Sequence, residues 1–159
     1  MTTAEPISVL FVCMGNICRS PAAEYFMRAA LEEQGSADLF NIDSAGTGGW
    51  PAVNKPDRHM QSVAKKAGLA IDGSARQVCS KDFSRFDWVF CMDNKNYADC
   101  IEMGADPNRT HVFLKFIEHP SISEVPDPYY GGSRGFDNVI SLLNNAILEL
   151  TKRSTPKFS

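Results

Sequence analysis

The sequence predicts an α/β fold in which apolar strands alternate with helices along 159 residues. Three observations predict it. Short runs rich in β-branched and aromatic residues recur along the chain, and segments with helical spacing of apolar residues separate them. The first run leads through a glycine-containing loop directly into a helix start. Because 43% of the residues are hydrophobic, we expect one domain over residues 1–159, with 1–5 and 153–159 flexible.

Local patterns set the boundaries of each element. Residues 7–12 form the first apolar run, and Ser20 is predicted to cap the first helix, with a proline at its first position. Gly46 ends the second strand, Gly68 stops the second helix, and Asp93 caps the third helix. The predicted strands are 7–12, 40–44, 86–92 and 111–114, and the predicted helices are 21–34, 57–67, 94–103 and 135–151.

The loop after the first strand indicates a function most directly. A cysteine and an arginine stand there with five residues between them, in the order Cys13, Met14, Gly15, Asn16, Ile17, Cys18, Arg19 and Ser20. Gly15 and Asn16 tolerate a left-handed backbone, so successive N–H groups can converge beside the positive end of a helix. Residues 14–20 are therefore predicted to bind phosphate. A helix N-terminus and an adjacent arginine favour the thiolate of Cys13, which is the chemistry of a cysteine-dependent phosphatase.

The same cysteine-to-arginine spacing occurs a second time, from Cys79 to Arg85. Its loop has no glycine, and it carries Asp82, which would repel a phosphate. Ser80 predicts an ordinary helix cap there instead. The strand–loop–helix context, and not the spacing alone, therefore selects Cys13.

A phosphatase that attacks through a cysteine also needs a proton donor for the leaving group. Ligands of parallel sheets bind beyond the carboxyl ends of the strands, where Cys13, Ser44, Asp93 and Asp127 are all expected. Asp127 is our candidate acid, because prolines on both sides stiffen its position. Composition alone leaves open a turn-rich surface loop at this place.

Charge and residue usage exclude several other functions. A net charge of −3 argues against a general nucleic-acid partner, and the chain has no apolar run long enough for membrane insertion. The first residues lack the basic start of a signal peptide. Five cysteines without zinc-type pairs fit a reducing cytoplasm, and the three histidines are scattered. We therefore expect a cytoplasmic protein with no metal and no cofactor.

The chain resembles the low-molecular-weight protein tyrosine phosphatases along nearly its whole length. The matching blocks follow the family's order and read VLFVCMGNICRSP, DSAGTGGW, ARQV, FDWVFCMDNKN and DPYYGG. The resemblance implies three layers, a four-stranded parallel sheet flanked by helices on both faces, with the phosphate-binding loop after strand one. It also implies metal-independent hydrolysis of phosphotyrosine, in a protein or a small aryl phosphate, through a cysteinyl-phosphate.

The resemblance further implies a role for each matched catalytic residue. Cys13 is expected to be the nucleophile, Arg19 to grip two phosphate oxygens, and Asp127 to act as acid and then as base. Asn16 would hold the strained loop backbone, with Ser44 hydrogen-bonded to it.

The remaining matched residues support the loop or surround the substrate. Ser20 would assist the thiolate, and Asp93 would help to support the loop. Cys18 would form a reversible disulfide with the nucleophile, or else is a small buried residue in a tight loop. A flat pocket for the aromatic ring would be walled by Ile17, Trp50, Tyr129 and Tyr130. With tyrosines beside the site, we expect a monomer or weak self-association.

Departures from the family and two alternatives complete the prediction. Gly73-Ser74 stands where many family members have a histidine that helps to fix the loop.

Two other functions stay possible on the sequence alone. An arsenate reductase on the same fold would relay oxidation through Cys79 or Cys91. A non-catalytic module that binds phosphotyrosine or another anion would need neither a nucleophilic thiol nor an acid.

Overall fold

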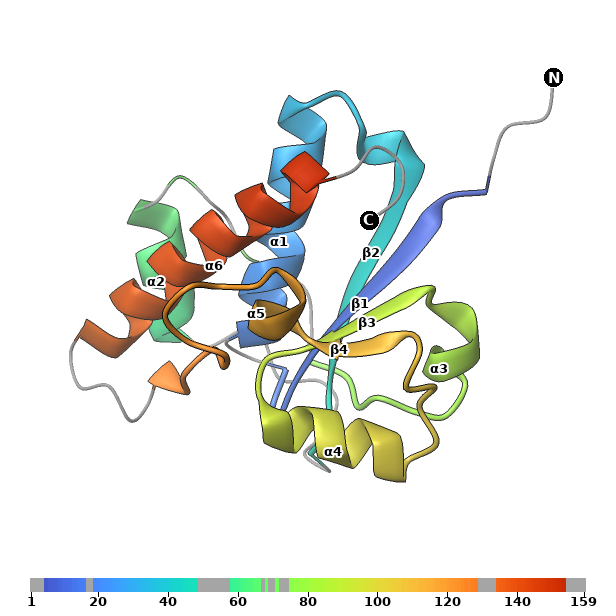
Figure 1. Cartoon of the computed structure of the whole chain (residues 1–159). Coiled ribbons are helices and arrows are strands. Elements are labelled where there is room, and N and C mark those ends of the chain that lie inside the picture. The colour runs from blue at the N-terminus through green and yellow to red at the C-terminus, as the bar shows by residue number, and fades with distance from the viewer. Residues whose placement is uncertain are drawn as a thin grey trace, which may run out of the picture.

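Four parallel strands form the central sheet, in the order β2-β1-β3-β4 (Figure 1). The computed structural model of the chain describes residues 5–16, 19–48, 58–66, 68, 71, 75–128 and 134–153. The strands are β1 (Ile7–Cys13), β2 (Phe40–Gly46), β3 (Trp88–Cys91) and β4 (Thr110–Val112). β1 pairs with β2 on one side and with β3 on the other, so that Val9 lies opposite both Ile42 and Trp88. The predicted four-stranded parallel sheet is confirmed.

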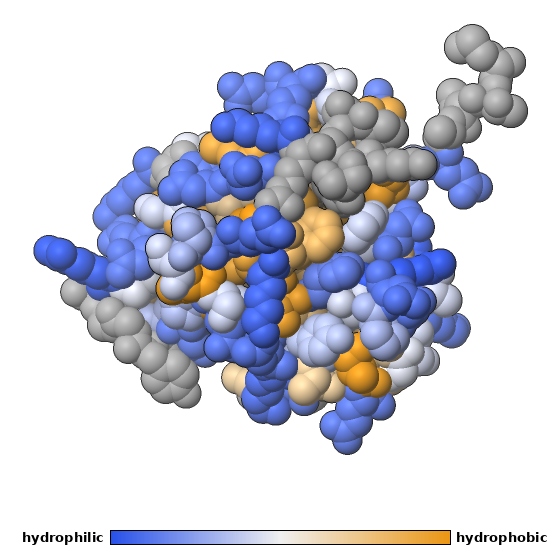
Figure 2. Space-filling view, in the orientation of Figure 1, coloured by the Kyte–Doolittle hydropathy of each residue, from blue (hydrophilic) through white to orange (hydrophobic). Residues whose placement is uncertain are grey.

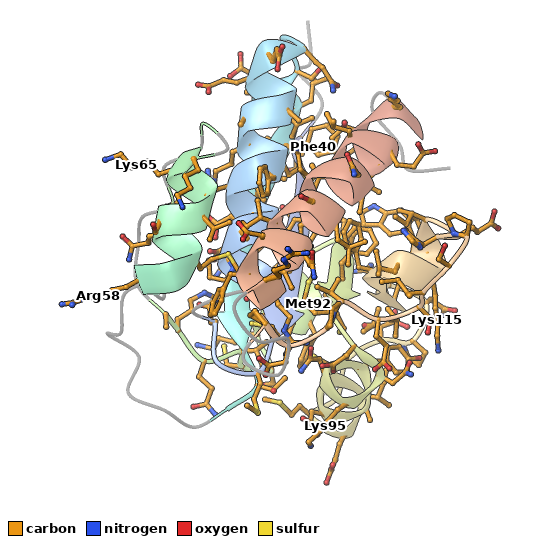
Figure 3. The ribbon with its side chains drawn as sticks, turned by 90° about the vertical axis from the view of Figure 1, so that its left-hand side faces the viewer. Phe40, Arg58, Lys65, Met92, Lys95 and Lys115 are labelled. Carbon is orange, nitrogen blue, oxygen red and sulfur yellow. The ribbon has the colours of Figure 1, made fainter. Side chains whose placement is uncertain are left out.

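Helices cover both faces of this sheet, as the three-layer prediction requires. One face carries α1 (Arg19–Glu33), α2 (Arg58–Lys66), α5 (Phe113–Phe116) and α6 (Gly135–Arg153). The other face carries α3 (Asp82–Arg85) and α4 (Asn94–Glu102), and a short 3-10 turn, η1 (Ala37–Leu39), precedes β2. In Figure 3, Arg58 and Lys65 extend outward from α2, whereas Met92 lies inside the molecule.

Alternation along β1 divides the interior into two cores. Phe11 faces the larger core under α1 and α6, and Leu10 faces the smaller core under α4. The Phe90 ring lies 5.9 Å from the Phe11 ring and 5.6 Å from the Phe113 ring, so aromatic packing ties β1, β3 and α5 together. Because β1 is buried on both faces, its last residue, Cys13, is fixed in position.

Polar side chains cover most of the face of the molecule seen in Figure 2. The face in Figure 2 is largely hydrophilic, with hydrophobic atoms in small areas separated by polar side chains. In the described ranges, the exposed large hydrophobic residues are Met14, Leu39, Ile122 and Leu148. None of the helices in this part of the chain is long and apolar enough to span a bilayer.

The predicted fourth strand, 111–114, is wrong at its end. β4 stops at Val112, and Phe113 and Leu114 begin a helical turn, with the Ile117 N–H donating to the Phe113 carbonyl at 3.2 Å. β3 offers partners to β4 only up to Cys91. Beyond that point a helical turn satisfies the backbone and still buries both apolar side chains.

Two predicted helix caps are also wrong. α1 begins at Arg19, so Ser20 lies inside its first turn, where Pro21 is tolerated because N–H groups there have no helical partner. α3 begins after Lys81, without a side-chain cap from Ser80. The predicted Asp93 cap is confirmed, since its carboxylate accepts from the Asn96 N–H.

Candidate active site

Cys13 ends β1 at the point where the chain turns toward α1. Its Sγ lies 2.9 Å from Ser20 Oγ and accepts a hydrogen bond from the Asn16 N–H at 3.3 Å. The side chain is almost fully buried. It lies beside the first turn of α1, where helix N–H groups without partners favour a negative charge. The sulfur therefore lies among hydrogen-bonding groups at the start of a helix.

Asn16 holds the loop in an unusual backbone conformation. Its φ of 54° lies in the left-handed region, which few residues other than glycine adopt. The side-chain Nδ2 donates to Ser20 Oγ at 2.9 Å, and Oδ1 accepts from the Arg76 N–H at 2.9 Å. Asn16 therefore connects the loop to α1 on one side and to the segment after α2 on the other. The role of Asn16 in supporting the phosphate site stays a prediction.

The predicted hydrogen bond between Ser44 and Asn16 is wrong. Ser44 Oγ donates instead to Glu24 Oε1 at 2.6 Å, and Arg28 Nε donates to Glu24 Oε2 at 3.0 Å. Glu24 is buried, and burial raises the pKa of its carboxyl although Ser44 and Arg28 oppose the change. A buried carboxyl needs donors, so it takes the nearest hydroxyl, and Asn16 takes the Arg76 N–H.

Arg76 is a supporting residue that sequence reasoning missed. Its guanidinium donates to both Asp82 oxygens at 3.0 Å each and to Asp43 Oδ2 at 3.2 Å. The Cys79 N–H also donates to Asp82, at 2.8 Å. These bonds fix the segment whose backbone holds Asn16. Positions 73–74, where the family's histidine is replaced, lie outside the described residues; the signal for Arg76 was its place in the matched ARQV block.

The charges in this network shift one another. Burial alone would raise the pKa of Asp82, but hydrogen bonds from Arg76 and Cys79 outweigh it and hold the pKa below its ordinary value. Burial alone would lower the pKa of Arg76, and its two carboxylate partners raise it instead. Both groups are therefore charged at neutral pH.

Gly46 lets the end of β2 approach the loop closely. A Cβ atom there would lie 2.6 Å from the Met14 carbonyl oxygen and 3.1 Å from the Asn16 nitrogen. The next two residues donate to the loop, Thr47 N–H to the Cys13 carbonyl at 2.9 Å and Gly48 N–H to the Met14 carbonyl at 2.8 Å. These bonds turn loop carbonyl oxygens toward β2.

Arg19 is almost fully buried and tied to two other elements. Its Nη1 donates to Asp93 Oδ2 at 2.7 Å and to the Val125 carbonyl at 3.0 Å. Burial alone would lower the pKa of Arg19, but the negative charges of Cys13, Asp93 and Asp127 raise it. Asp93 uses its other oxygen to cap α4, accepting from the Asn96 N–H at 2.7 Å.

Asp127 lies half-buried between two fixed points of the chain. On one side the Val125 N–H donates to the Met92 carbonyl at 2.8 Å, next to the end of β3. On the other side Pro128 packs so closely on Gly135 that a Cβ there would overlap the Pro128 carbonyl oxygen. The negative charge of Asp127 is also the weakest of the charges that raise the pKa of Arg19.

The remaining predicted site residues are not among the described ones. They are Ile17, Cys18, Trp50, Tyr129 and Tyr130. The pocket wall and the Cys13–Cys18 disulfide therefore stay predictions. In the part of the chain that the structure describes, no three His, Cys, Asp or Glu side chains gather as a metal site would require.

The fold and the loop define a three-layer α/β protein with a cysteine-centred anion site. The family described as low molecular weight phosphotyrosine protein phosphatase matches residues 8–157, and the chain belongs to this family.

Individual relatives agree with the family match. A low molecular weight phosphotyrosine protein phosphatase of Schizosaccharomyces pombe is 45% identical over 82% of this chain and 85% of its own. YfkJ of Bacillus subtilis, a low molecular weight protein-tyrosine-phosphatase, is 39% identical over 91% of this chain and 93% of its own. Its crystal structure matches with a TM-score of 0.89, covering 98% of this chain and 99% of that one. The crystal structure of a protein tyrosine phosphatase of Entamoeba histolytica matches with a TM-score of 0.86 at 37% identity, covering 92% of this chain and 96% of that one. These relatives do not favour the arsenate reductase alternative.

Gly46→Ala is expected to weaken the binding of inorganic phosphate by roughly tenfold or more, because overpacking of this kind costs about 1–3 kcal/mol. The new methyl group would push the Met14 carbonyl and displace the loop. Isothermal titration measures the effect. Gly35→Ala is the matched control, because Gly35 (φ 74°) is strained but open and follows the far end of α1. Equal phosphate affinity in the two variants would contradict the prediction.

Asp82→Asn is expected to lower the free energy of unfolding by about 2 kcal/mol near neutral pH, the usual worth of hydrogen bonds to a charged group. Because the pKa of folded Asp82 is lowered, its carboxylate stabilises the fold above the unfolded pKa. That contribution is lost as the pH falls through the folded pKa. The difference from the parent protein should therefore shrink below about pH 4.

Urea denaturation across this pH range tests the Asp82 prediction. Asp38→Asn, which removes an exposed carboxyl from η1, is the control and should change stability little at any pH. A pH-independent difference for Asp82→Asn would show that its charge does not stabilise the fold.

Proposed function

We propose that the protein is a tyrosine phosphatase that hydrolyses phosphotyrosine, in proteins or small aryl phosphates, through a cysteinyl-phosphate. One observation carries the proposal: the buried Cys13 sulfur accepts the Asn16 N–H, and the charged Arg19, where α1 begins, is held by two other elements. A nucleophile and a fixed cation then stand at the two ends of one anion-binding loop. Family membership supports the same reaction.

Arg19 is arranged to bind the phosphoryl group with one edge. Its Nη1 already donates to Asp93 and to the Val125 carbonyl. The Nε and Nη2 donors are then the pair that can grip two phosphate oxygens, the geometry in which guanidinium binds phosphate best. Together with the loop N–H groups, Arg19 offsets the charge on the equatorial oxygens in the transition state.

In the first step the Cys13 thiolate attacks phosphorus and the bond to the phenolic oxygen breaks. Asp127, in its protonated form, gives its proton to that oxygen as it leaves. Ser20 Oγ, 2.9 Å from the sulfur, stabilises the thiolate before attack and as it leaves in the second step.

In the second step water cleaves the sulfur–phosphorus bond. Asp127, now a carboxylate, takes a proton from the attacking water, and the thiolate departs as inorganic phosphate forms. Acid and base are the same carboxyl in its two protonation states, so each cycle returns the site to its starting form.

The cytoplasm is the compartment we propose for the protein. Cys13, Cys79, Cys91 and Cys100 are all free thiols, which suits a reducing environment. A nucleophilic thiolate also stays reduced there.

Cys13→Ser is expected to lower turnover of an aryl phosphate by roughly 10⁴-fold or more, because a hydroxyl in this place is a far weaker nucleophile. Binding of inorganic phosphate should persist, since Arg19 and the loop backbone remain. Cys79→Ser is the matched control: it changes the cysteine of the second Cys-to-Arg match, is exposed, and should leave turnover unchanged. Full activity in a clean Cys13→Ser preparation would contradict the proposal.

Asp127→Ala is expected to lower phosphate release from phenyl phosphate by roughly 10²-fold, the usual contribution of a general acid. The assay is run with a metal chelator, and it separates the alternatives. A binding module would release no phosphate even as the parent protein. A reductase would instead oxidise thiols in the presence of arsenate and would need Cys79 or Cys91.

A further inference from the structure

We propose that Glu124 is a positioning residue for the reaction: by binding the first N–H of α4, its carboxylate fixes the place of Asp127. The inference rests on the proposed function, in which Asp127 is the acid and base. Glu124 is exposed and belongs to no core, so packing does not explain its contact. Within the described part of the chain, its carboxylate accepts a hydrogen bond from a backbone group of another element.

The contact completes the N-terminus of α4. Glu124 Oε2 accepts from the Asn94 N–H at 2.8 Å, and Asn94 is the first residue of the helix. That N–H has no acceptor inside the helix. Asp93 accepts from the Asn96 N–H, so two carboxylates share this helix end, where the helix dipole favours negative charge.

Only a few backbone torsions separate Glu124 from Asp127. Val125 is 1% exposed, and both its N–H and its carbonyl are bonded, to Met92 and to Arg19. Pro126 has a fixed φ, and the residue before each proline is restricted to an extended backbone. Anchoring Glu124 therefore limits where the Asp127 carboxyl can lie.

The same helix end also positions Arg19. Asp93 joins Arg19 to α4 at 2.7 Å, and Glu124 joins the segment of Asp127 to the residue that follows Asp93. The arginine that grips phosphate and the segment of the acid that protonates the leaving group are thus both bonded to the start of α4. Loss of the Glu124 contact would remove one restraint on the segment of the acid, while Arg19 keeps its bond to Asp93.

A second side-chain contact at this helix end provides a control. Lys115 Nζ donates to the Asn94 side-chain oxygen at 2.8 Å, and this bond comes from α5 and not from the segment of Asp127. Figure 3 shows Lys115 on α5 at the right and Lys95 on α4 at the bottom, both on the outside of the molecule. Lys115→Ala therefore disturbs Asn94 but leaves the anchor of Asp127 in place.

The experiment compares two substrates that differ in their need for an acid. Phenyl phosphate has a poor leaving group that must be protonated, whereas dinitrophenyl phosphate leaves with little help. Glu124→Ala is expected to lower kcat/KM for phenyl phosphate by about tenfold, because a small displacement of a catalytic group lowers the rate by about this factor. For dinitrophenyl phosphate, which needs little help from the acid, the loss should be less than about twofold. Glu124→Gln keeps an acceptor oxygen and should restore most of the loss. Lys115→Ala should match the parent protein on both substrates.

Each other result overturns the inference in a recognisable way. An equal loss on both substrates would mean that Glu124 supports the fold in general, and no loss on either would mean that it positions nothing. Asp127→Ala is measured in parallel. If Asp127→Ala discriminates between the substrates and Glu124→Ala does not, only this inference fails. If Asp127→Ala does not discriminate, the proposed acid and this inference fail together.

Discussion

The buried guanidinium of Arg19 is the constraint on which the rest of the site depends. A buried cation is tolerated only when it is paired and hydrogen-bonded, and breaking such a pair costs about 3–5 kcal/mol in proteins. Asp93 and the Val125 carbonyl meet this need, so α1, α4 and the segment after α5 must come together at one place. That place is the carboxyl end of β1 and β3, neighbouring strands at which the chain changes direction across the sheet.

A second constraint acts on the loop itself. The left-handed Asn16 costs conformational energy, and the structure holds it through Ser20 on one side and Arg76 on the other. Arg76 is in turn fixed by Asp82, a buried carboxylate in α3. The loop is therefore supported from the smaller core as well as from α1. The fold thus holds the Asn16 N–H toward the Cys13 sulfur before any ligand arrives, and donors fixed in advance are what an oxyanion site requires.

Local sequence signals predicted most of the fold, and tertiary contacts account for what they missed. The sheet, its four strands and the Asp93 cap followed from apolar runs and a capping residue. The end of the fourth strand could not be predicted in this way. Phe113 and Leu114 are apolar and would be buried in a strand or in a helix, and the strand ends before them because β3 offers no further partners. The Ser44 partner was also missed, since it depends on a buried carboxyl twenty residues away, Glu24. The pairing of Arg19 with Asp93 joins residues 74 positions apart, beyond any local pattern.

The charges around Arg19 explain why the backbone and the acid both matter. Asp93 alone offsets the formal charge of the guanidinium, so a phosphate dianion that enters beside the Cys13 thiolate meets little net positive charge from side chains. The loop N–H groups and the start of α1 must supply the remaining attraction. In the proposed mechanism Asp127 is the acid, and the proton it gives to the leaving group also removes a negative charge that would repel the phosphate. The proposal thus gives one carboxyl two tasks, to meet the phosphate without repulsion and to protonate the leaving phenol, and a fixed position for Asp127 would serve both.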